Sequence, residues 1–160
     1  MNLTTDSLKY YFEINKRLTS EFDTDWTPLW NYCEMTSMLI KGHSWTFLMK
    51  GGLENRKLIY RNWKNSEQNS KNDLGIFSLK NIKIDEKEVS ISLNELFEIQ
   101  NLLKSDLTIN RTEKIILDGV RYELTDFKTE RKYEWKLDEE MNSNLKQLIE
   151  KITAHNNGYK

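Results

Sequence analysis

Leu117-Asp118-Gly119-Val120 is the stretch that decides the fold. An Asp-Gly step between two runs of alternating apolar and polar residues is the strongest short-range signal for a β-hairpin. Ile115 and Leu117 precede the step, and residues 120–125 alternate apolar and polar side chains after it. We therefore predict a hairpin whose turn lies at Asp118-Gly119.

A third alternating run, residues 132–137, follows this hairpin. Its apolar members are Tyr133, Trp135 and Leu137, and lysine and glutamate fill the positions between them. Three such runs predict an antiparallel meander with one apolar face and one charged face. We expect a last amphipathic helix to cover the apolar face, with Asp138 at its start and Glu139 and Glu140 in its first turn, where the helix dipole favours negative charge.

The middle of the chain predicts a second hairpin followed by a helix. Residues 82–84 and 89–91 alternate apolar and polar side chains, and Asp85-Glu86-Lys87 between them is the expected turn. Ser92 and Glu95 have the spacing of a capping box, in which each side chain covers the other's backbone N–H group. Leucine, phenylalanine and isoleucine then recur at helical spacing up to Lys104.

The N-terminal half is harder to assign. Residues 8–22 fit both a strand and a helix, and we favour a helix because residues 5–7 supply N-cap side chains. Thr27-Pro28 is typical of a helix start, and Gly42 is a suitable residue for the end of that helix. Residues 44–49 and 58–63 then predict two strands joined by a turn near Gly51-Gly52.

These elements predict one α+β domain over residues 1–160. A single antiparallel sheet of about five to seven strands, arranged like a meander, would be packed by an N-terminal, a middle and a C-terminal helix. Residues 64–73 contain no apolar side chain, so we expect a mobile loop there, and we expect residues 154–160 to fray.

The composition bounds the function. The chain has 160 residues and a net charge of −1, whereas nucleic-acid-binding proteins are usually basic, so we do not expect nucleic acid as the partner. The single cysteine, Cys33, cannot form an intramolecular disulfide. Residues 1–7 are polar, and the longest apolar runs are too short for a membrane span. We expect a cytoplasmic protein with no membrane segment.

Three groups of residues are candidates for chemistry. Cys33 and His43 could act as nucleophile and base, but Cys33 also fits a buried apolar position. Asp23 and Asp25 could hold a divalent cation, but the rest of a calcium-binding loop is missing. The basic side chains of residues 111–132 alternate with glutamates, which is typical of a solvated sheet face. We predict no catalytic residue, no metal site and no cofactor.

Aromatic residues are dense between positions 26 and 63. They could fill the core between the predicted second helix and the first hairpin, or they could form a surface that stacks bases or anchors a protein partner. Both assignments can hold for different members. Because Tyr60 and Trp63 point to opposite sides of one strand, we expect Trp63, beside the polar loop, to be partly exposed.

The stretch from Ile116 to Leu124, followed by Tyr133-Glu134-Trp135 and a terminal helix, resembles small bacterial immunity proteins encoded beside secreted toxins. The immunity proteins of contact-dependent growth inhibition are one such group. The resemblance covers roughly the last quarter of the chain. It implies a cytoplasmic protein that holds a toxin by surface complementarity, and it identifies no functional residue.

The leading functional hypothesis is a non-enzymatic protein-binding domain, namely an immunity protein that neutralises a toxin by stoichiometric binding. Aromatic and acidic side chains are the expected contacts with the partner. They are Trp63, Tyr60, Asp23, Asp25, Glu139 and Glu140. The alternative is a small ligand-binding protein or enzyme with a pocket between the second helix and the sheet.

Overall fold

The computed structural model describes residues 13–17, 22, 24–36, 41–65, 82–112, 120–137 and 139–156. Six strands form one antiparallel sheet in the order β4-β3-β2-β1-β6-β7. They are β1 (Thr27–Thr36), β2 (Lys41–Lys50), β3 (Gly52–Asn65), β4 (Ile82–Val89), β6 (Val120–Asp126) and β7 (Arg131–Lys136). The predicted α+β class, with a single main antiparallel sheet, is confirmed.

The remaining elements lie outside this sheet. They are helix α3 (Leu93–Lys104), strands β5 (Ile109–Asn110) and β8 (Glu140–Met141), helix α4 (Ser143–Thr153) and the 3₁₀ turn η2 (Ala154–Asn156). β5 and β8 pair with each other. No helix among the residues that the structure describes is long and apolar enough to cross a membrane.

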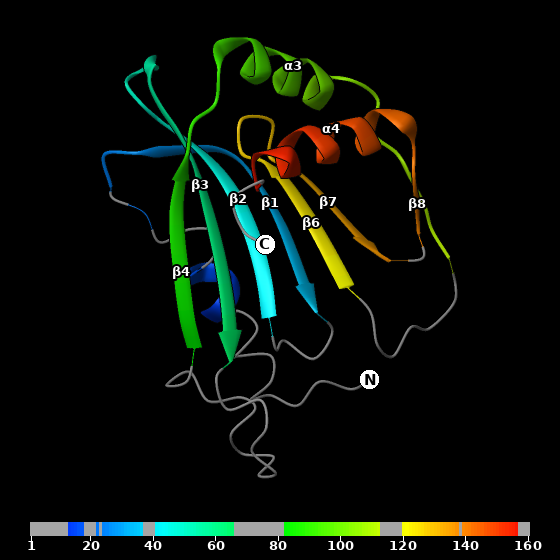
Figure 1. Cartoon of the computed structure of the whole chain (residues 1–160). Helices are drawn as coiled ribbons and strands as arrows, with labels where there is room; N and C mark the ends of the chain where they lie inside the picture. The colour runs from blue at the N-terminus through cyan, green and yellow to red at the C-terminus, as the bar shows by residue number, and fades with distance from the viewer. Residues whose placement is uncertain are drawn as a thin grey trace.

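The sheet is built in two parts. β1 to β4 follow one another as a meander, and the chain then passes through α3 before β6 pairs with the free side of β1. α3 and α4 lie beside each other across one end of the sheet (Figure 1). We call the side that they cover the helix face. A short helix at residues 13–17 lies on the other side, which we call the opposite face.

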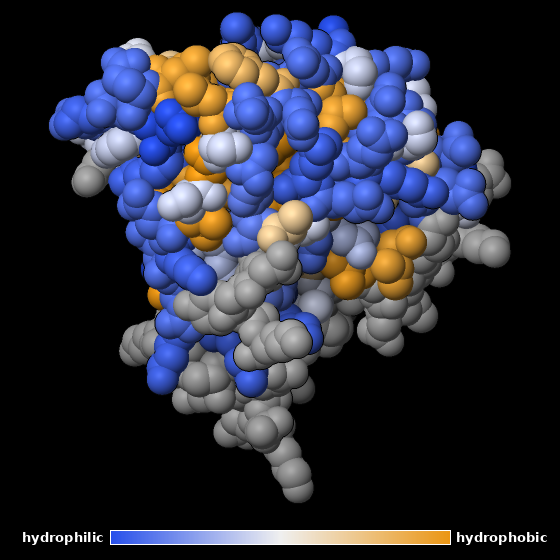
Figure 2. Space-filling view, turned by 45° about the horizontal axis from the view of Figure 1, so that its top comes forward, coloured by the Kyte–Doolittle hydropathy of each residue, from blue (hydrophilic) through white to orange (hydrophobic). Residues whose placement is uncertain are grey.

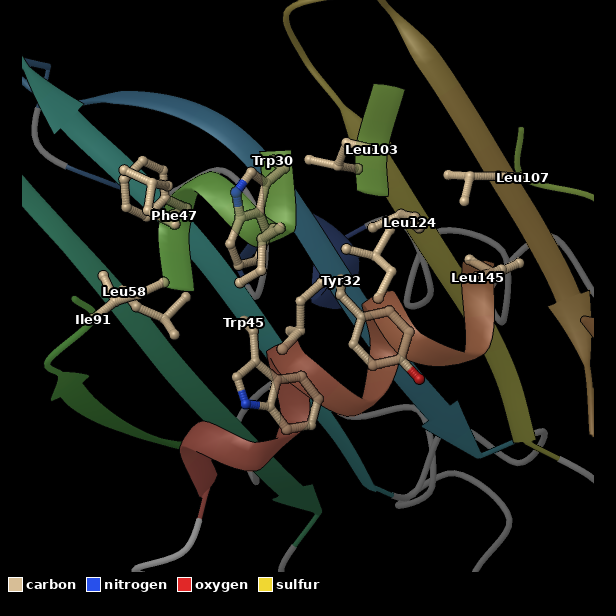
Figure 3. Close-up of a cluster of buried hydrophobic side chains, with 14 of the residues drawn as sticks. Trp30, Tyr32, Trp45, Phe47, Leu58, Ile91, Leu103, Leu107, Leu124 and Leu145 are labelled. Atoms are coloured by element: carbon tan, nitrogen blue, oxygen red, sulfur yellow. The ribbon is translucent and has the colours of Figure 1, made fainter. Parts of the chain in front are cut away.

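The main core lies between the two helices and the helix face (Figure 3). Each helix contributes one buried stripe, which is Leu96, Ile99 and Leu103 in α3 and Leu145, Leu148 and Ile152 in α4. The sheet contributes Trp30, Tyr32, Trp45, Phe47, Leu58, Tyr60, Leu124 and Trp135. Burying one large apolar side chain contributes roughly 1.5–3 kcal/mol. This core therefore fixes both helices on the sheet.

The predicted helix from Thr27-Pro28 to Gly42 is wrong, because residues 27–36 form β1 and Gly42 lies in β2. β1 is a central strand buried on both sides, so it lacks the apolar–polar alternation of a half-buried strand. Trp30 and Tyr32 face α3 and α4, while Cys33 faces the other way. Residues 27–36 therefore do not form the helix that was expected to line a pocket against the sheet.

The predicted turn at Asp85-Glu86-Lys87 is also wrong, because β4 runs straight through it. These charged residues belong to an edge strand, where solvated side chains are tolerated and discourage pairing with other chains. The capping box is confirmed: Glu95 N–H donates to the Ser92 hydroxyl over 3.2 Å, and Ser92 N–H donates to the Glu95 carboxylate over 2.9 Å. α3 begins directly after Ser92.

The Asp118-Gly119 step lies outside the described residues, as does the run before it. The alternation after it is confirmed in β6, but β6 pairs with β1 on one side and β7 on the other along its length. The strand predicted at residues 115–117 lies outside the described residues. The following hairpin, β6–β7, is confirmed.

The final helix begins later than predicted. α4 starts at Ser143, and the Asn142 side chain accepts a hydrogen bond from Leu145 N–H over 3.0 Å. Glu140 lies in β8 rather than in the first helical turn. The strands predicted at 44–49 and 58–63 are confirmed as parts of β2 and β3. Residues 13–17 are helical, as we predicted for the N-terminal segment.

Two predicted flexible segments are only partly described. Residues 64 and 65 of the polar run belong to β3, and residues 66–73 lie outside the described residues. Of the predicted frayed tail, residues 154–156 form η2, and residues 157–160 lie outside the described residues.

Candidate functional site

The six residues predicted to contact a partner do not form one surface. Trp63 and Tyr60 are buried, with 1% and 2% of their surface exposed, so the expected exposure of Trp63 is wrong. Tyr60 packs in the main core, and Trp63 points to the opposite face. The sequence could not reveal the burial of Trp63, since it depends on what packs against that face.

The predicted acidic contacts have separate roles. Asp25 is exposed and pairs with Lys50 over 3.4 Å, and Asp23 lies outside the described residues. Glu140 is exposed in β8. Glu139 makes two structural contacts, which together we call the Glu139 clamp. Its carboxylate accepts a hydrogen bond from Lys136 N–H over 3.0 Å and forms an ion pair with Arg111 over 3.2 Å.

The Glu139 clamp protects the outer edge of the sheet. Arg111 also donates to the carbonyl oxygen of Glu134 in β7, so one ion pair covers two backbone groups of that edge strand. Covered edges do not pair with other chains. Glu139 therefore serves the fold, and of the predicted acidic contacts that the structure describes, only Asp25 and Glu140 lie at the surface.

Cys33 and His43 cannot act together, because they point to opposite sides of the sheet. Cys33 pairs in register with Ser44 of β2, whereas His43 pairs with Glu34 of β1. Cys33 is fully buried, and burial raises the pKa of its thiol. A buried thiol with a raised pKa is a packing residue rather than a nucleophile.

The helix face carries a row of mostly polar side chains along the border of the core, which we call the polar row; its last member, Trp135, belongs to the core itself. It takes one residue from each strand, all in register. From β4 to β7 these are Asp85, Asn62, His43, Glu34, Tyr122 and Trp135. Sequence periodicity could not reveal the polar row, because it depends on the pairing of strands far apart in the chain.

Buried tyrosines are hydrogen-bonded to Glu34 and His43 of the polar row. The Tyr32 hydroxyl donates to Glu34 over 2.7 Å, and His43 Nδ1 shares a hydrogen bond of 2.5 Å with the Tyr60 hydroxyl. Burial raises the pKa of Tyr122, and the nearby Glu34 carboxylate adds to this effect. Burial lowers the pKa of His43, so its ring is neutral at pH 7. The polar row therefore stabilises the sheet end with hydrogen bonds between neutral rings and one carboxylate.

A network of ion pairs spans β6 and β7 on the opposite face. Glu123 is buried and pairs with Arg121 over 3.3 Å and with Lys132 over 3.7 Å. Glu134 pairs with the same two cations over 3.0 Å and 2.8 Å. Alternating charges of this kind neutralise one another, as predicted for the basic side chains of this region.

The outer surface of α3 carries two apolar side chains that helical periodicity alone would assign to the core. Leu93 and Phe97 continue the apolar pattern of the helix, but they point outward and are 44% and 49% exposed. Residues four apart lie on the same helix surface, so they form one apolar pair. Figure 2 shows apolar surface among hydrophilic side chains at this end of the molecule. Two other large apolar side chains, Phe127 and Leu137, are exposed near the β6–β7 hairpin.

The described residues contain no candidate metal centre. Within the described ranges, no three histidine, cysteine, aspartate or glutamate side chains lie close enough together to hold a metal ion.

Comparisons with protein-family models, with curated proteins and with solved structures found no match to this chain. The exposed pair on α3 is thus the candidate contact surface that the chain's own geometry supports best.

Proposed function

We propose that this chain is a non-enzymatic protein-binding domain, an immunity protein that neutralises a bacterial toxin by stoichiometric binding. The observation that carries the proposal is the exposed apolar pair of Leu93 and Phe97 on α3. Apolar anchors surrounded by polar side chains are typical of protein interfaces. Each anchor would lose its remaining contact with water when a partner covers it.

The rigidity of α3 supports this role. The capping box fixes its first turn, and Leu96 and Ile99 anchor its inner side in the core. Lys151 of α4 pairs with Glu98 over 2.5 Å. A surface that is ordered before binding loses little conformational entropy when the partner arrives.

The separation of Cys33 from His43 also favours binding over catalysis. The one nucleophile-and-base pair that the sequence offered is divided between two faces of the sheet. His43 and the neighbouring Glu34 are each hydrogen-bonded to a buried tyrosine. Stoichiometric occlusion of a toxin requires none of these groups to react.

Co-purification with the product of the neighbouring gene tests the proposal. We expect wild-type protein to form a 1:1 complex with a Kd below about 1 μM, and Leu93→Gln with Phe97→Gln to weaken it at least about tenfold, as loss of interface anchors does. The matched control is Phe127→Gln with Leu137→Gln, which makes the same chemical change on exposed side chains elsewhere. The proposal fails if wild-type protein forms no complex tighter than micromolar.

A further inference from the structure

Three exposed lysines lie in one cross-strand row at the end of the sheet farthest from α3 and α4. Lys41 of β2 pairs in register with Lys64 of β3, and Lys64 pairs with Lys83 of β4. All three are exposed. Figure 1 shows the corresponding strand ends away from the two helices. We call these residues the lysine row.

The lysine row belongs to the helix face. Side chains alternate between the two sides of a strand. Lys41 and Lys64 are each two residues away from a member of the polar row, His43 and Asn62, and Lys83 is two residues from Asp85. The three ammonium groups therefore project from the same side of three neighbouring strands.

Folding alone does not favour this arrangement. Like charges directly opposite each other on neighbouring strands destabilise a sheet. Within the part of the chain that the structure describes, none of the three ammonium groups is in an ion pair. On the opposite face, by contrast, Arg121 and Lys132 are each paired with glutamates. An anionic partner would relieve the repulsion in the lysine row.

We propose that the lysine row binds an acidic helix of a partner protein, a step that rests on the proposed protein-binding function. Neighbouring strands are about 4.8 Å apart, so the row spans roughly 10 Å. Acidic side chains on successive turns of a helix repeat every 5.4 Å or so along its axis, which departs from the row by only about 1 Å over two intervals. In an extended strand, side chains on one face repeat about every 6.7 Å, and the mismatch grows to about 4 Å.

Charge around the row favours a short acidic segment over nucleic acid. On the helix face, Asp85 of β4 is two residues from Lys83, and Glu34 lies in the polar row. A phosphate chain extending past three lysines would meet these carboxylates, and the chain as a whole carries a net charge of −1. A helix whose three carboxylates match the three lysines places no further negative charge beside Asp85 and Glu34.

A synthetic peptide tests the assignment without knowledge of the natural partner. The probe is a fluorescently labelled helical peptide with glutamate at positions i, i+3 and i+7, which lie on one side of the helix over about 10.5 Å. Its partner probe has glutamine at the same three positions. Anisotropy is measured at about 0.01 M salt, where charges interact over roughly 30 Å, and at 0.15 M. At 0.01 M salt we expect the glutamate peptide to bind more tightly than the glutamine peptide. At 0.15 M salt we expect no difference between the two peptides.

The variants show whether the lysine row is responsible. We expect Lys41→Gln, Lys64→Gln and Lys83→Gln combined to weaken peptide binding about tenfold. The matched control is Lys128→Gln, Lys136→Gln and Lys146→Gln combined, which removes the same charge from exposed lysines elsewhere and should leave binding within about twofold. Equal losses in both variants would overturn the proposal, because general attraction would then explain the binding.

Two further readouts complete the test. The lysine-row variant should unfold at the same temperature as wild type or a higher one, because its like-charge repulsion is gone, and a lower temperature would contradict the argument. Tighter binding of a single-stranded oligonucleotide than of the glutamate peptide, lost in the same variant, would replace the acidic helix with nucleic acid. Neither readout uses the product of the neighbouring gene, so a failure here is separate from a failure of the proposed function.

Discussion

Trp63 occupies the space in which a side chain at Gly42 would begin. The two residues pair in register between β3 and β2, and a Cβ atom at Gly42 would lie 2.3 Å from the indole Nε1 of Trp63 and 3.1 Å from the carbonyl oxygen of Glu34. Trp63 is buried, so its indole cannot move into solvent. We expect Gly42→Ala to lower the free energy of unfolding by about 1–3 kcal/mol, the usual cost of overpacking a core.

Urea unfolding of three variants tests this prediction. Gly52→Ala is the matched control, since the three atoms nearest a Cβ there all belong to the Glu54 carboxylate, which is exposed and can rotate away. Trp63→Leu combined with Gly42→Ala should lose less stability than the two single changes together, because the smaller side chain leaves room for the added methyl group. Equal losses for Gly42→Ala and Gly52→Ala would show that the close approach of Trp63 does not matter.

Glu123 should contribute more to stability than Glu134, although both pair with Arg121 and Lys132. The Glu123 side chain is 5% exposed, and the Glu134 side chain is 39% exposed. We expect Glu123→Gln to cost about 1–3 kcal/mol, less than a fully buried ion pair because both cations reach solvent. Glu134→Gln should cost less than about 1 kcal/mol. Guanidinium or high salt would screen these ion pairs, so the comparison requires urea at low salt. A larger loss of stability in Glu134→Gln than in Glu123→Gln would contradict the prediction.

The capping box should stabilise α3 by a measurable amount. Ser92→Ala removes the hydroxyl that accepts from Glu95 N–H, and we expect a loss of about 1 kcal/mol, whereas Ser92→Gly should cost only a few tenths. Ser90, which is exposed and precedes the cap, supplies the control Ser90→Ala. Circular dichroism during thermal unfolding measures all three. Indistinguishable midpoints for Ser92→Ala and Ser90→Ala would contradict the role of the cap.

Local signals in the sequence predicted some elements correctly. The capping box at Ser92 and Glu95 and the strands around Trp45 and Tyr60 depend on neighbouring residues, and all three are present. The helix predicted from Thr27 is wrong because burial of β1 on both sides removes the alternation that identifies a strand, and because Thr27-Pro28 also fits a helix start. β2 is also buried on both sides, but Ser44 and Thr46 alternate with its aromatic residues, so the strand pattern is preserved there.

The candidate surfaces could not be predicted in the same way. The lysine row exists only because Lys41, Lys64 and Lys83 share a register across three strands, and single-sequence periodicity does not define register. Leu93 and Phe97 fit the apolar pattern of α3, but the buried stripe of the helix runs through Leu96 and its neighbours instead. Which apolar residues remain exposed depends on how α3 and α4 pack together.

The burial of His43 should make the free energy of unfolding depend on pH below about pH 6.5. Burial lowers its pKa below the ordinary 6.5; Lys41 adds to this lowering, and Glu34 opposes it. The unfolded chain therefore binds more protons than the folded chain in the interval between the two pKa values. The free energy of unfolding should be constant above about pH 6.5 and fall as the pH drops toward the folded pKa.

Two measurements on His43 separate this effect from that of the carboxylates. NMR titration of its ring should give a pKa below 6.5, and His43→Gln should remove the slope of stability against pH just below 6.5. The lowered pKa values of Glu134 and Glu139 add stability that is complete above about pH 4.5 and is lost as the pH falls through those values, so their contribution lies in a more acidic range. Tyr60→Phe removes the hydrogen bond but keeps the burial, and should leave the His43 pKa below 6.5. A slope that persists in His43→Gln would mean that another group is responsible.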